Sequence, residues 1–288
     1  MWLYCRGRAD PPAFVDTLEE DLLEPPLTGR EAAFLHDVCR EAGALTLRYF
    51  GRVSGWTEKS GRGDIVTEAD HAVEELVARR LAEELPGHSL LTEERGFVPG
   101  HQDAPIWVLD PVDGTRNFAL GVPVYCVSLA CVAGGKILLG AVYDPVHDIL
   151  YHAESGKGAF QNEVPVRVSE TPDLHDALIS VSWSPRRRDV EEYVRIVARV
   201  ATHTSYFRRI GSAALVLSYV ATGRFDGYIQ AGISPWDIAA GTLLVREAGG
   251  VVTDIQGCPF DILTPSLDIV AGNPAVHRCL MEDVLRKS

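Results

Sequence analysis

The sequence predicts a fold of the α/β or α+β class, with helices and sheets stacked in layers. Helical and strand patterns occur in blocks, and neither an internal repeat of fixed period nor a low-complexity stretch interrupts them. Of the 288 residues, 46% are hydrophobic and 23% are charged, as in ordinary globular proteins that bury a large core. We expect a folded domain at residues 28–288, preceded by a proline-containing, acidic extension at residues 1–27.

Two amphipathic helices are predicted at the start of this domain. The first begins with the capping-box pattern Thr28–Glu31 and ends at Gly51, with apolar residues at helical spacing between them. The second follows Thr67 and stops at Pro86-Gly87. The apolar run 106–109 then predicts a short buried strand that ends in a tight turn at Asp110–Thr115.

Strand and turn patterns fill the middle of the chain. They predict an antiparallel meander with strands at 124–133, 136–143, 148–153 and 164–168. The second half alternates between the two kinds of element. Its strands are predicted at 177–182, 207–210, 225–230 and 268–271, and its helices at 190–201, 212–221, 236–247 and from 274 onward.

Charge and composition exclude several kinds of partner. The formal net charge is −13, so the surface repels phosphate backbones and anionic lipid, and we expect neither nucleic acid nor a membrane as partner. No apolar run approaches the ~20 residues that span a bilayer, and the N-terminus lacks the apolar length of a signal peptide, which favours a cytoplasmic protein. The six cysteines form no C-x-x-C pair, which favours reduced core residues over a disulfide or a zinc site.

Acidic residues at the ends of predicted elements indicate a metal site. They are Glu93-Glu94, Asp110, Asp113 and Asp237. Carboxylates that share a pocket repel one another unless divalent cations neutralise them, and oxygen-only ligands suit Mg²⁺, Mn²⁺ or Ca²⁺. Directly after Asp113, Gly114 permits close approach of a ligand to the backbone, and Thr115 offers a hydroxyl and an amide, so phosphate is a candidate ligand.

Each of these residues also has a purely structural interpretation. Asp-Pro and Asp-Gly are common in turns, Glu93-Glu94 is equally a solvated surface pair, and Asp237 stabilises a helix N-terminus. A capped helix start explains Thr67 and Asp70. The basic cluster Arg186–Arg188 is typical of a solvated loop, with a phosphate or a partner subunit as the alternatives.

Other catalytic motifs are missing from the sequence. There is no G-x-S-x-G, no G-x-x-x-x-G-K-[ST], no G-x-G-x-x-G and no H-E-x-x-H. These absences weaken serine hydrolase, nucleoside triphosphatase, dinucleotide-binding and zinc protease interpretations.

Taken together, the segments resemble the inositol monophosphatase family, within the lithium-sensitive, magnesium-dependent phosphatases. Trp107–Phe118 is similar to its first signature, W-x-x-D-P-[IVL]-D-G-T-x-N-[FY]. Trp236–Gly241 with Glu247–Gly250 is similar to the second, W-D-x-A-[AG]-G followed by E-A-G-G. Three further stretches match in order: Lys59–Asp70, Thr92–Glu94 and Gly211–Ala214.

The resemblance implies a five-layer α-β-α-β-α sandwich, a homodimer, and direct hydrolysis of a phosphomonoester by metal-activated water. It implies two or three Mg²⁺ ions, with Mn²⁺ as an alternative, held by Glu93, Asp110, Asp113, Asp237 and the main-chain carbonyl of Val112. Thr115, Glu93 and Asp70 would be the catalytic residues, with Thr115 orienting the water and Asp70 near a water or a third ion. Substrate contacts would come from Asp113, Gly114, Thr115, Ser212, Ala213, Gln230 and Asp237.

The substrate implied is a small phosphorylated metabolite, inositol-1-phosphate first. Gln230 stands where inositol-specific members carry a glutamate, and Arg116 replaces a small or hydroxyl residue. Arg116 either favours a more anionic substrate or pairs with a nearby acid. The alternatives are the same chemistry on fructose-1,6-bisphosphate, histidinol phosphate, NADP or adenosine 3′,5′-bisphosphate, and, in another class, a non-catalytic metal-binding dimer that acts through protein contacts.

Overall fold

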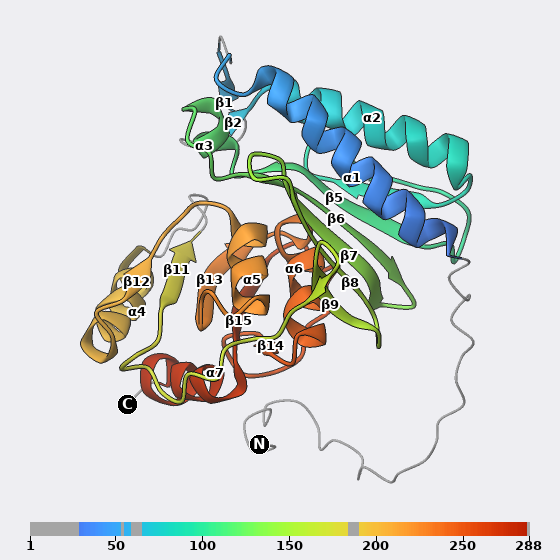
Figure 1. The fold of residues 1–288 in the computed structure, drawn as a ribbon. Helices are drawn as coiled ribbons and strands as arrows, with labels where there is room; N and C mark the ends of the chain where they lie inside the picture. Colours follow the sequence, from blue (N-terminus) through green and yellow to red (C-terminus); the bar gives the residue numbers. More distant parts are fainter. Residues whose placement is uncertain (1–28, 53–54, 59–64, 184–189, 287–288) are drawn as a thin grey trace, which may run out of the picture.

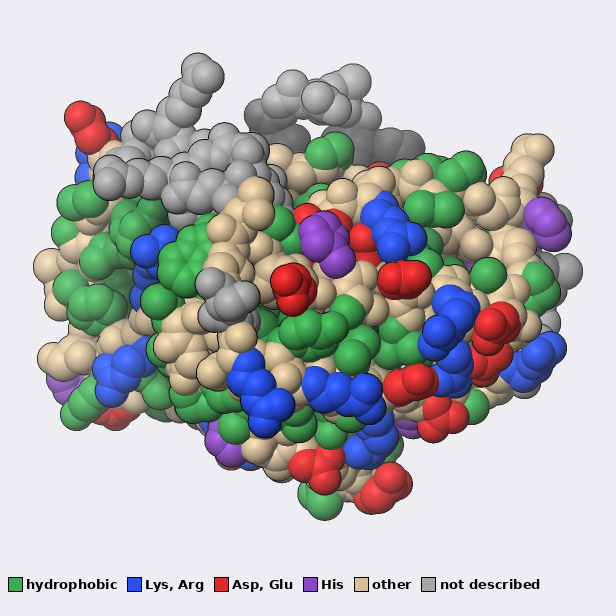
Figure 2. All heavy atoms as spheres, turned by 90° about the horizontal axis from the view of Figure 1, so that it is seen from above, with side chains coloured by type: hydrophobic (Ala, Val, Ile, Leu, Met, Phe, Trp, Pro, Cys, Tyr) green, Lys and Arg blue, Asp and Glu red, His purple; other side chains and the backbone are tan. Residues whose placement is uncertain are grey.

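Two helices pack side by side on the outer face of a large sheet. The computed structural model describes residues 29–52, 55–58, 65–183 and 190–286, and its first two helices are α1 (Arg30–Tyr49) and α2 (Glu68–Glu84). Their apolar faces, with Phe34, Val38 and Val77 among them, form one core cluster with the sheet. Their outer faces carry interspersed charges (Figure 2), for example the ion pairs of Arg80 with Glu84 and Glu41.

The starts of these helices test the predicted caps. The capped helix start at Thr67 is confirmed, and it takes the form of a capping box in which Thr67 and Asp70 bond reciprocally at the start of α2. The capping box predicted at Thr28–Glu31 is not the observed cap of α1. The N-cap of α1 is Gly29, with φ 81° and no side-chain cap bond, Thr28 lies outside the described residues, and Glu31 is buried.

The large sheet has eight strands in the order β10-β9-β8-β7-β6-β5-β3-β4. The predicted antiparallel meander is confirmed for β6, β7, β8 and β10, and β9 is an additional strand that the sequence analysis did not predict. The strands are β3 (Ser89–Thr92), β4 (Gly96–Val98), β5 (Ile106–Asp113), β6 (Cys126–Ala133), β7 (Lys136–Asp144), β8 (Ile149–Glu154), β9 (Gly158–Gln161) and β10 (Val164–Pro165). A separate pair, β1 (Thr57–Glu58) and β2 (Ile65–Val66), precedes α2.

Strand β5 is longer than the sequence predicts. The predicted turn at Asp110 is wrong, because the strand continues through Pro111 to Asp113, with an irregular register against β6 between Asp110 and Asp113. Proline is tolerated where a ladder bond is already missing. The chain turns at Gly114 instead, into the short helix α3 (Thr115–Ala119).

A second sheet contains five strands in the order β12-β11-β13-β15-β14. Its strands are β11 (Ile179–Trp183), β12 (Phe207–Arg208), β13 (Gly227–Ile233), β14 (Val251–Thr253) and β15 (Leu267–Gly272). Between the two sheets lie α5 (Ala213–Ala221) and α6 (Pro235–Glu247), which form a common core with both.

Small residues allow this close stacking. A Cβ added at Gly140 of β7 would lie 2.9 Å from the Cα of Ala240, and one at Gly241 would lie 2.5 Å from the Cβ of Leu217 in α5. The A-A-G run of the second signature therefore serves packing.

The outer face of the second sheet is covered by α4 (Val190–His203), α7 (Pro274–Cys279) and the π-helix Leu280–Leu285. Figure 1 shows the resulting sequence of helix pair, sheet, helix pair, sheet and helices, so the predicted five-layer sandwich is confirmed. None of the described helices is long and apolar enough to cross a membrane.

Four of the cysteines are free, namely Cys39, Cys126, Cys131 and Cys279. The prediction of reduced cysteines holds for these four and is wrong for Cys258, which is disulfide-bonded. Cys5 lies outside the described residues.

Candidate metal centre

Three aspartates converge where the two sheets meet. Asp110 and Asp113 lie at the irregular end of β5, and Asp237 lies in the first turn of α6, where its carboxylate also caps the helix by accepting from the Ser234 amide at 2.8 Å. One oxygen from each carboxylate lies within 4.8 Å of the others. Asp237 therefore stabilises the N-terminus of α6, as predicted, and also belongs to the acidic cluster.

Two further carboxylates approach this cluster from the first half of the chain. Glu93 lies half-buried in the turn between β3 and β4 and lines the same pocket as Asp113 and Asp237. Asp70 is fully buried at the start of α2. Its Oδ2 accepts from the hydroxyl of Thr67 at 2.6 Å, whereas Oδ1 has no hydrogen-bond partner among the described residues.

Burial and mutual repulsion raise the pKa values of these acids. Burial is the largest cause for both Asp110 and Asp237, whose pKa values lie well above the ordinary range, and the negative charge of Glu93 adds to both. Burial also raises the pKa of Asp70 to about 7, against the hydrogen bonds from Thr67. A bound cation would stabilise the ionised form of these carboxylates.

The donors present fit a hard divalent cation. Every candidate ligand is an oxygen, which suits Mg²⁺, Mn²⁺ or Ca²⁺ and not zinc or copper. The unpartnered Oδ1 of Asp70 is a buried polar atom of the kind that an ion or its water would satisfy. The aspartate triad can therefore hold a metal ion.

Protein groups bind both carboxylate oxygens of Asp113. Its Oδ2 accepts from the Ser212 hydroxyl at 2.5 Å and from the Ala214 amide at 2.7 Å, and its Oδ1 accepts from the Ala213 amide at 3.1 Å. Burial raises its pKa, and these bonds act against that shift. Ser212 and Ala213, predicted as substrate contacts, line the pocket and bind Asp113.

The turn after β5 presents backbone groups to the same pocket. Gly114 has φ 98°, and a Cβ there would lie 2.9 Å from the carbonyl oxygen of Val124. The hydroxyl of Thr115 donates to the carbonyl of Val112 at 3.0 Å. That carbonyl keeps a second lone pair for another ligand. The first amides of α3 have no acceptor within the helix.

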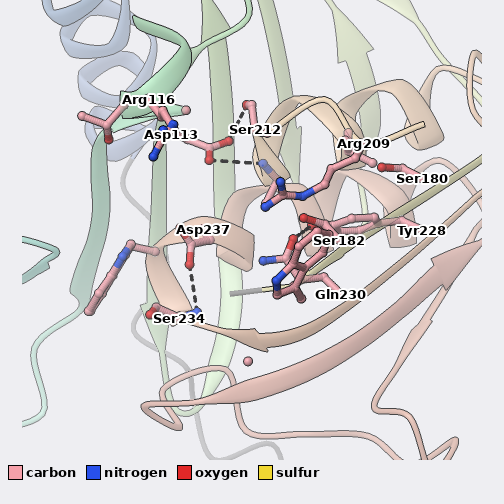
Figure 3. A pocket seen from close by; sticks show the side chains of 18 of the residues that line it. Asp113, Arg116, Ser180, Ser182, Arg209, Ser212, Tyr228, Gln230, Ser234 and Asp237 are labelled. Atoms are coloured by element: carbon pink, nitrogen blue, oxygen red, sulfur yellow. Dashed lines mark hydrogen bonds between the residues drawn. The ribbon is translucent and has the colours of Figure 1, made fainter. Parts of the chain in front are cut away.

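The pocket itself is a cavity of about 200 Å³ between the carboxylates and the second sheet. Figure 3 shows Arg116 beside Asp113 at one end and Ser180, Tyr228 and Gln230 at the other. Arg116 lines the pocket, and no described carboxylate forms an ion pair with it.

Sequence reasoning missed lining residues on the second sheet, among them Ser180, Ser182, Trp183 and Tyr228, and also Arg209 directly after β12. The alternation of Ser180 and Ser182 around a valine was visible as one polar face of a strand. Two stretches singled out earlier, 59–64 and Arg186–Arg188, lie outside the described residues.

Other signature residues hold the scaffold. The side-chain amide of Asn117 donates to the carbonyls of Val124 and Ile210, each at 2.8 Å. Glu247 accepts from the amides of Gly156 and Gly158, each at 2.9 Å. These two residues join segments that are far apart in the sequence.

Comparison with known proteins agrees with the geometry. The model of the inositol monophosphatase family matches residues 30–288. An inositol-1-monophosphatase of Mesorhizobium japonicum is 41% identical over 246 residues, covering 85% of this chain and 92% of the relative. The Nus factor SuhB of Escherichia coli is 39% identical over 227 residues, covering 78% and 84%. The crystal structure of extragenic suppressor protein suhB from Bartonella henselae has a TM-score of 0.83 at 34% identity, covering 90% and 99%.

Proposed function

The chain belongs to the inositol monophosphatase family, and we propose that it is a Mg²⁺-dependent phosphomonoesterase for a small phosphorylated metabolite, inositol-1-phosphate first. The observation that carries this proposal is the aspartate triad, of which Asp113 and Asp237 line a pocket that Gly114 and Thr115 also line. The inositol-1-monophosphatase relative supports this choice of substrate.

The metal ligands in this proposal are Glu93, Asp110, Asp113, Asp237 and the carbonyl of Val112, with Asp70 close by. Bound divalent ions would lower the pKa of water and offset the charge of the phosphoryl group and leaving oxygen. The protein keeps these ligands fixed: Asp113 by the amides of α5, and Asp237 by its own helix. Mn²⁺ is expected to substitute for Mg²⁺, because it prefers the same ligands.

Thr115 is proposed to orient the attacking water. Its hydroxyl proton is donated to Val112, so the oxygen offers its lone pairs and would accept a hydrogen bond from water. The amides of Gly114 and Thr115 would donate to the phosphate oxygens, as backbone N–H groups at the start of a helix do. Water attacks phosphorus directly, so no phosphorylated residue forms.

A panel of esters tests the proposal. We expect phosphate release from inositol-1-phosphate with Mg²⁺, inhibition by lithium, and loss of at least 10³-fold in kcat for Asp110→Asn and Asp237→Asn. Asp176→Asn, an exposed aspartate outside the pocket, is the matched control. If the chain hydrolyses only fructose-1,6-bisphosphate, histidinol phosphate, NADP or adenosine 3′,5′-bisphosphate, the proposed substrate is wrong but the proposed metal-dependent hydrolysis stands. A phosphoaspartate trapped during turnover would contradict direct hydrolysis.

A second candidate function is favoured by the relative named Nus factor SuhB. In it, the chain is a metal-binding homodimer that acts through protein contacts without catalysis. Light scattering that gives twice the 31.4 kDa chain mass, together with Mg²⁺ binding but no turnover of any ester in the panel, would support this candidate over the enzyme.

A further inference from the structure

Arg209 is a cation in the pocket without an acidic partner. It lines the cavity, and its guanidinium carbon lies 3.9 Å from the centre of the Trp183 ring. None of the described carboxylates forms an ion pair with it. In the view of Figure 3 its side chain lies between Asp113 and Ser212 on one side and Ser182 and Gln230 on the other. The indole stack fixes the plane of the guanidinium and leaves its N–H groups for a ligand.

The strands β11 and β13, beside Arg209, line the pocket with polar side chains. β11 and β13 run parallel, and their register pairs Ser180 with Tyr228 and Ser182 with Gln230. Residues two apart on a strand share a face, and all four side chains line the pocket. The hydroxyl of Tyr228 donates to Oε1 of Gln230, so the amide nitrogen of Gln230 is the donor that it can offer to a ligand.

Ser180 gives an independent indication that a ligand binds here. Its side chain is 1% exposed, and its hydroxyl has no hydrogen-bond partner among the described residues. A buried hydroxyl without a partner is costly, and such groups are normally satisfied by protein, water or ligand.

We propose that Arg209, stacked on Trp183, together with Ser180, Ser182 and Gln230, forms a subsite for a second phosphate group of the substrate. This inference rests on the proposed phosphatase function and favours its bisphosphorylated alternatives over inositol-1-phosphate. The scissile phosphate would bind at the carboxylate end of the pocket, and the second phosphate would bind at the Arg209 end.

Charge favours a second phosphate over further hydroxyl groups at this end. The serines and Gln230 alone would suit a neutral polyol, because hydroxyls and amides donate and accept equally well. Arg209 only donates, and its planar fork matches two oxygens of a phosphate. Arg209 is exposed and lines the pocket, so its positive charge is available to an anionic group of a ligand that enters the pocket.

Matched pairs of esters test this inference. The full chain with Mg²⁺ is assayed on fructose 1-phosphate against fructose 1,6-bisphosphate, and on adenosine 5′-monophosphate against adenosine 3′,5′-bisphosphate. We expect kcat/KM to be at least tenfold higher for the bisphosphate of one pair, and that pair identifies the carrier of the second phosphate. Arg209→Gln should reduce this preference to less than twofold by slowing the bisphosphate more than the monophosphate, and Ser180→Ala should reduce it partly.

Arg208→Gln is the control, since Arg208 is the adjacent arginine, is exposed like Arg209, and does not line the pocket. It should leave the preference unchanged. If Arg209→Gln slows monophosphates and bisphosphates equally, Arg209 serves the scissile phosphate or the fold, and the subsite is refuted. No preference in the unmodified enzyme refutes it as well.

Failure of the proposed function gives a different result. If no ester is hydrolysed with Mg²⁺, the phosphatase proposal falls, and calorimetry can then measure binding of the same intact esters. Tighter binding of a bisphosphate than of its monophosphate, lost in Arg209→Gln, would still support the subsite, whereas equal binding would refute it.

Discussion

The hydroxyl of Ser212 lies 2.5 Å from Oδ2 of Asp113, although 99 residues separate them in the chain. This bond joins the end of β5 in the large sheet to the first turn of α5 between the sheets. It therefore connects a candidate metal ligand to the helix layer that the second sheet packs against.

Replacing Ser212 with alanine should weaken both the helix cap and the aspartate. Ser212 also accepts from the amide of Leu215, and loss of a cap or of a bond to a charged group costs about 1–3 kcal/mol. Since the bond from Ser212 acts to lower the pKa of Asp113, the acidic limb of the activity profile should move to higher pH. Ser218→Ala, which removes only a bond within α5, should leave the profile in place; an equal shift in both variants would contradict the argument.

Glu74 is expected to position Glu93. Its buried carboxylate accepts from the amides of Glu94 and Arg95, each at 3.2 Å, and lies 2.9 Å from the Arg95 guanidinium. Glu74→Gln should raise the Mg²⁺ concentration for half-maximal activity about 10–100-fold, the usual effect of losing a partner behind a metal site.

High Mg²⁺ should restore kcat in this Glu74→Gln variant, whereas the exposed neighbour Glu75, changed to glutamine, should have no effect. A loss of kcat that persists at every Mg²⁺ concentration would indicate a purely structural role for Glu74.

The stability of the metal-free protein should fall as pH rises. The folded pKa of Asp70 is raised to about 7 from 3.8, and those of Asp110 and Asp237 are raised as well. Between about pH 4 and pH 7 the folded state therefore binds more protons than the unfolded state, and the free energy of unfolding decreases through that window. Asp70 alone corresponds to a decrease on the order of 4 kcal/mol.

Mg²⁺ should reverse this loss by neutralising the carboxylates. The measurement is the midpoint of thermal unfolding in EDTA and in Mg²⁺ at pH 5 and pH 8, with a larger stabilisation by Mg²⁺ at pH 8. Equal stabilisation at the two pH values would count against a metal site made of these acids.

Gly114→Ala should destabilise the protein more than an ordinary substitution at positive φ. Strain at such a position costs about 1–3 kcal/mol, and the added Cβ would also contact the Val124 carbonyl at 2.9 Å. Gly134→Ala is the control, because Gly134 has φ 57° with nothing within 4 Å of its Cβ position. Chemical denaturation compares the two, and an equal loss would show that the close approach at Gly114 is unimportant.

Local pattern was sufficient for most elements of the fold. The helix that begins at Thr67, the meander strands β6, β7 and β8 and the helix at Asp237 lie where spacing and turn residues predicted them. The two signatures also identified the acids that the structure brings together, because their residue types and order are specific.

Several features depended on contacts between distant segments. The sequence did not show that β5 continues to Asp113, that Ser212 binds this residue, or that Arg209 stacks on Trp183 beside the buried Ser180. The spacing of residues along the sequence predicts which side chains are buried and which elements they belong to. Which side chains contact each other depends on sheet register and on the packing of the layers. The sequence by itself therefore determined the family and the acidic cluster, and only the tertiary structure decided which groups hold those acids and that Arg209 stacks on Trp183 in the pocket.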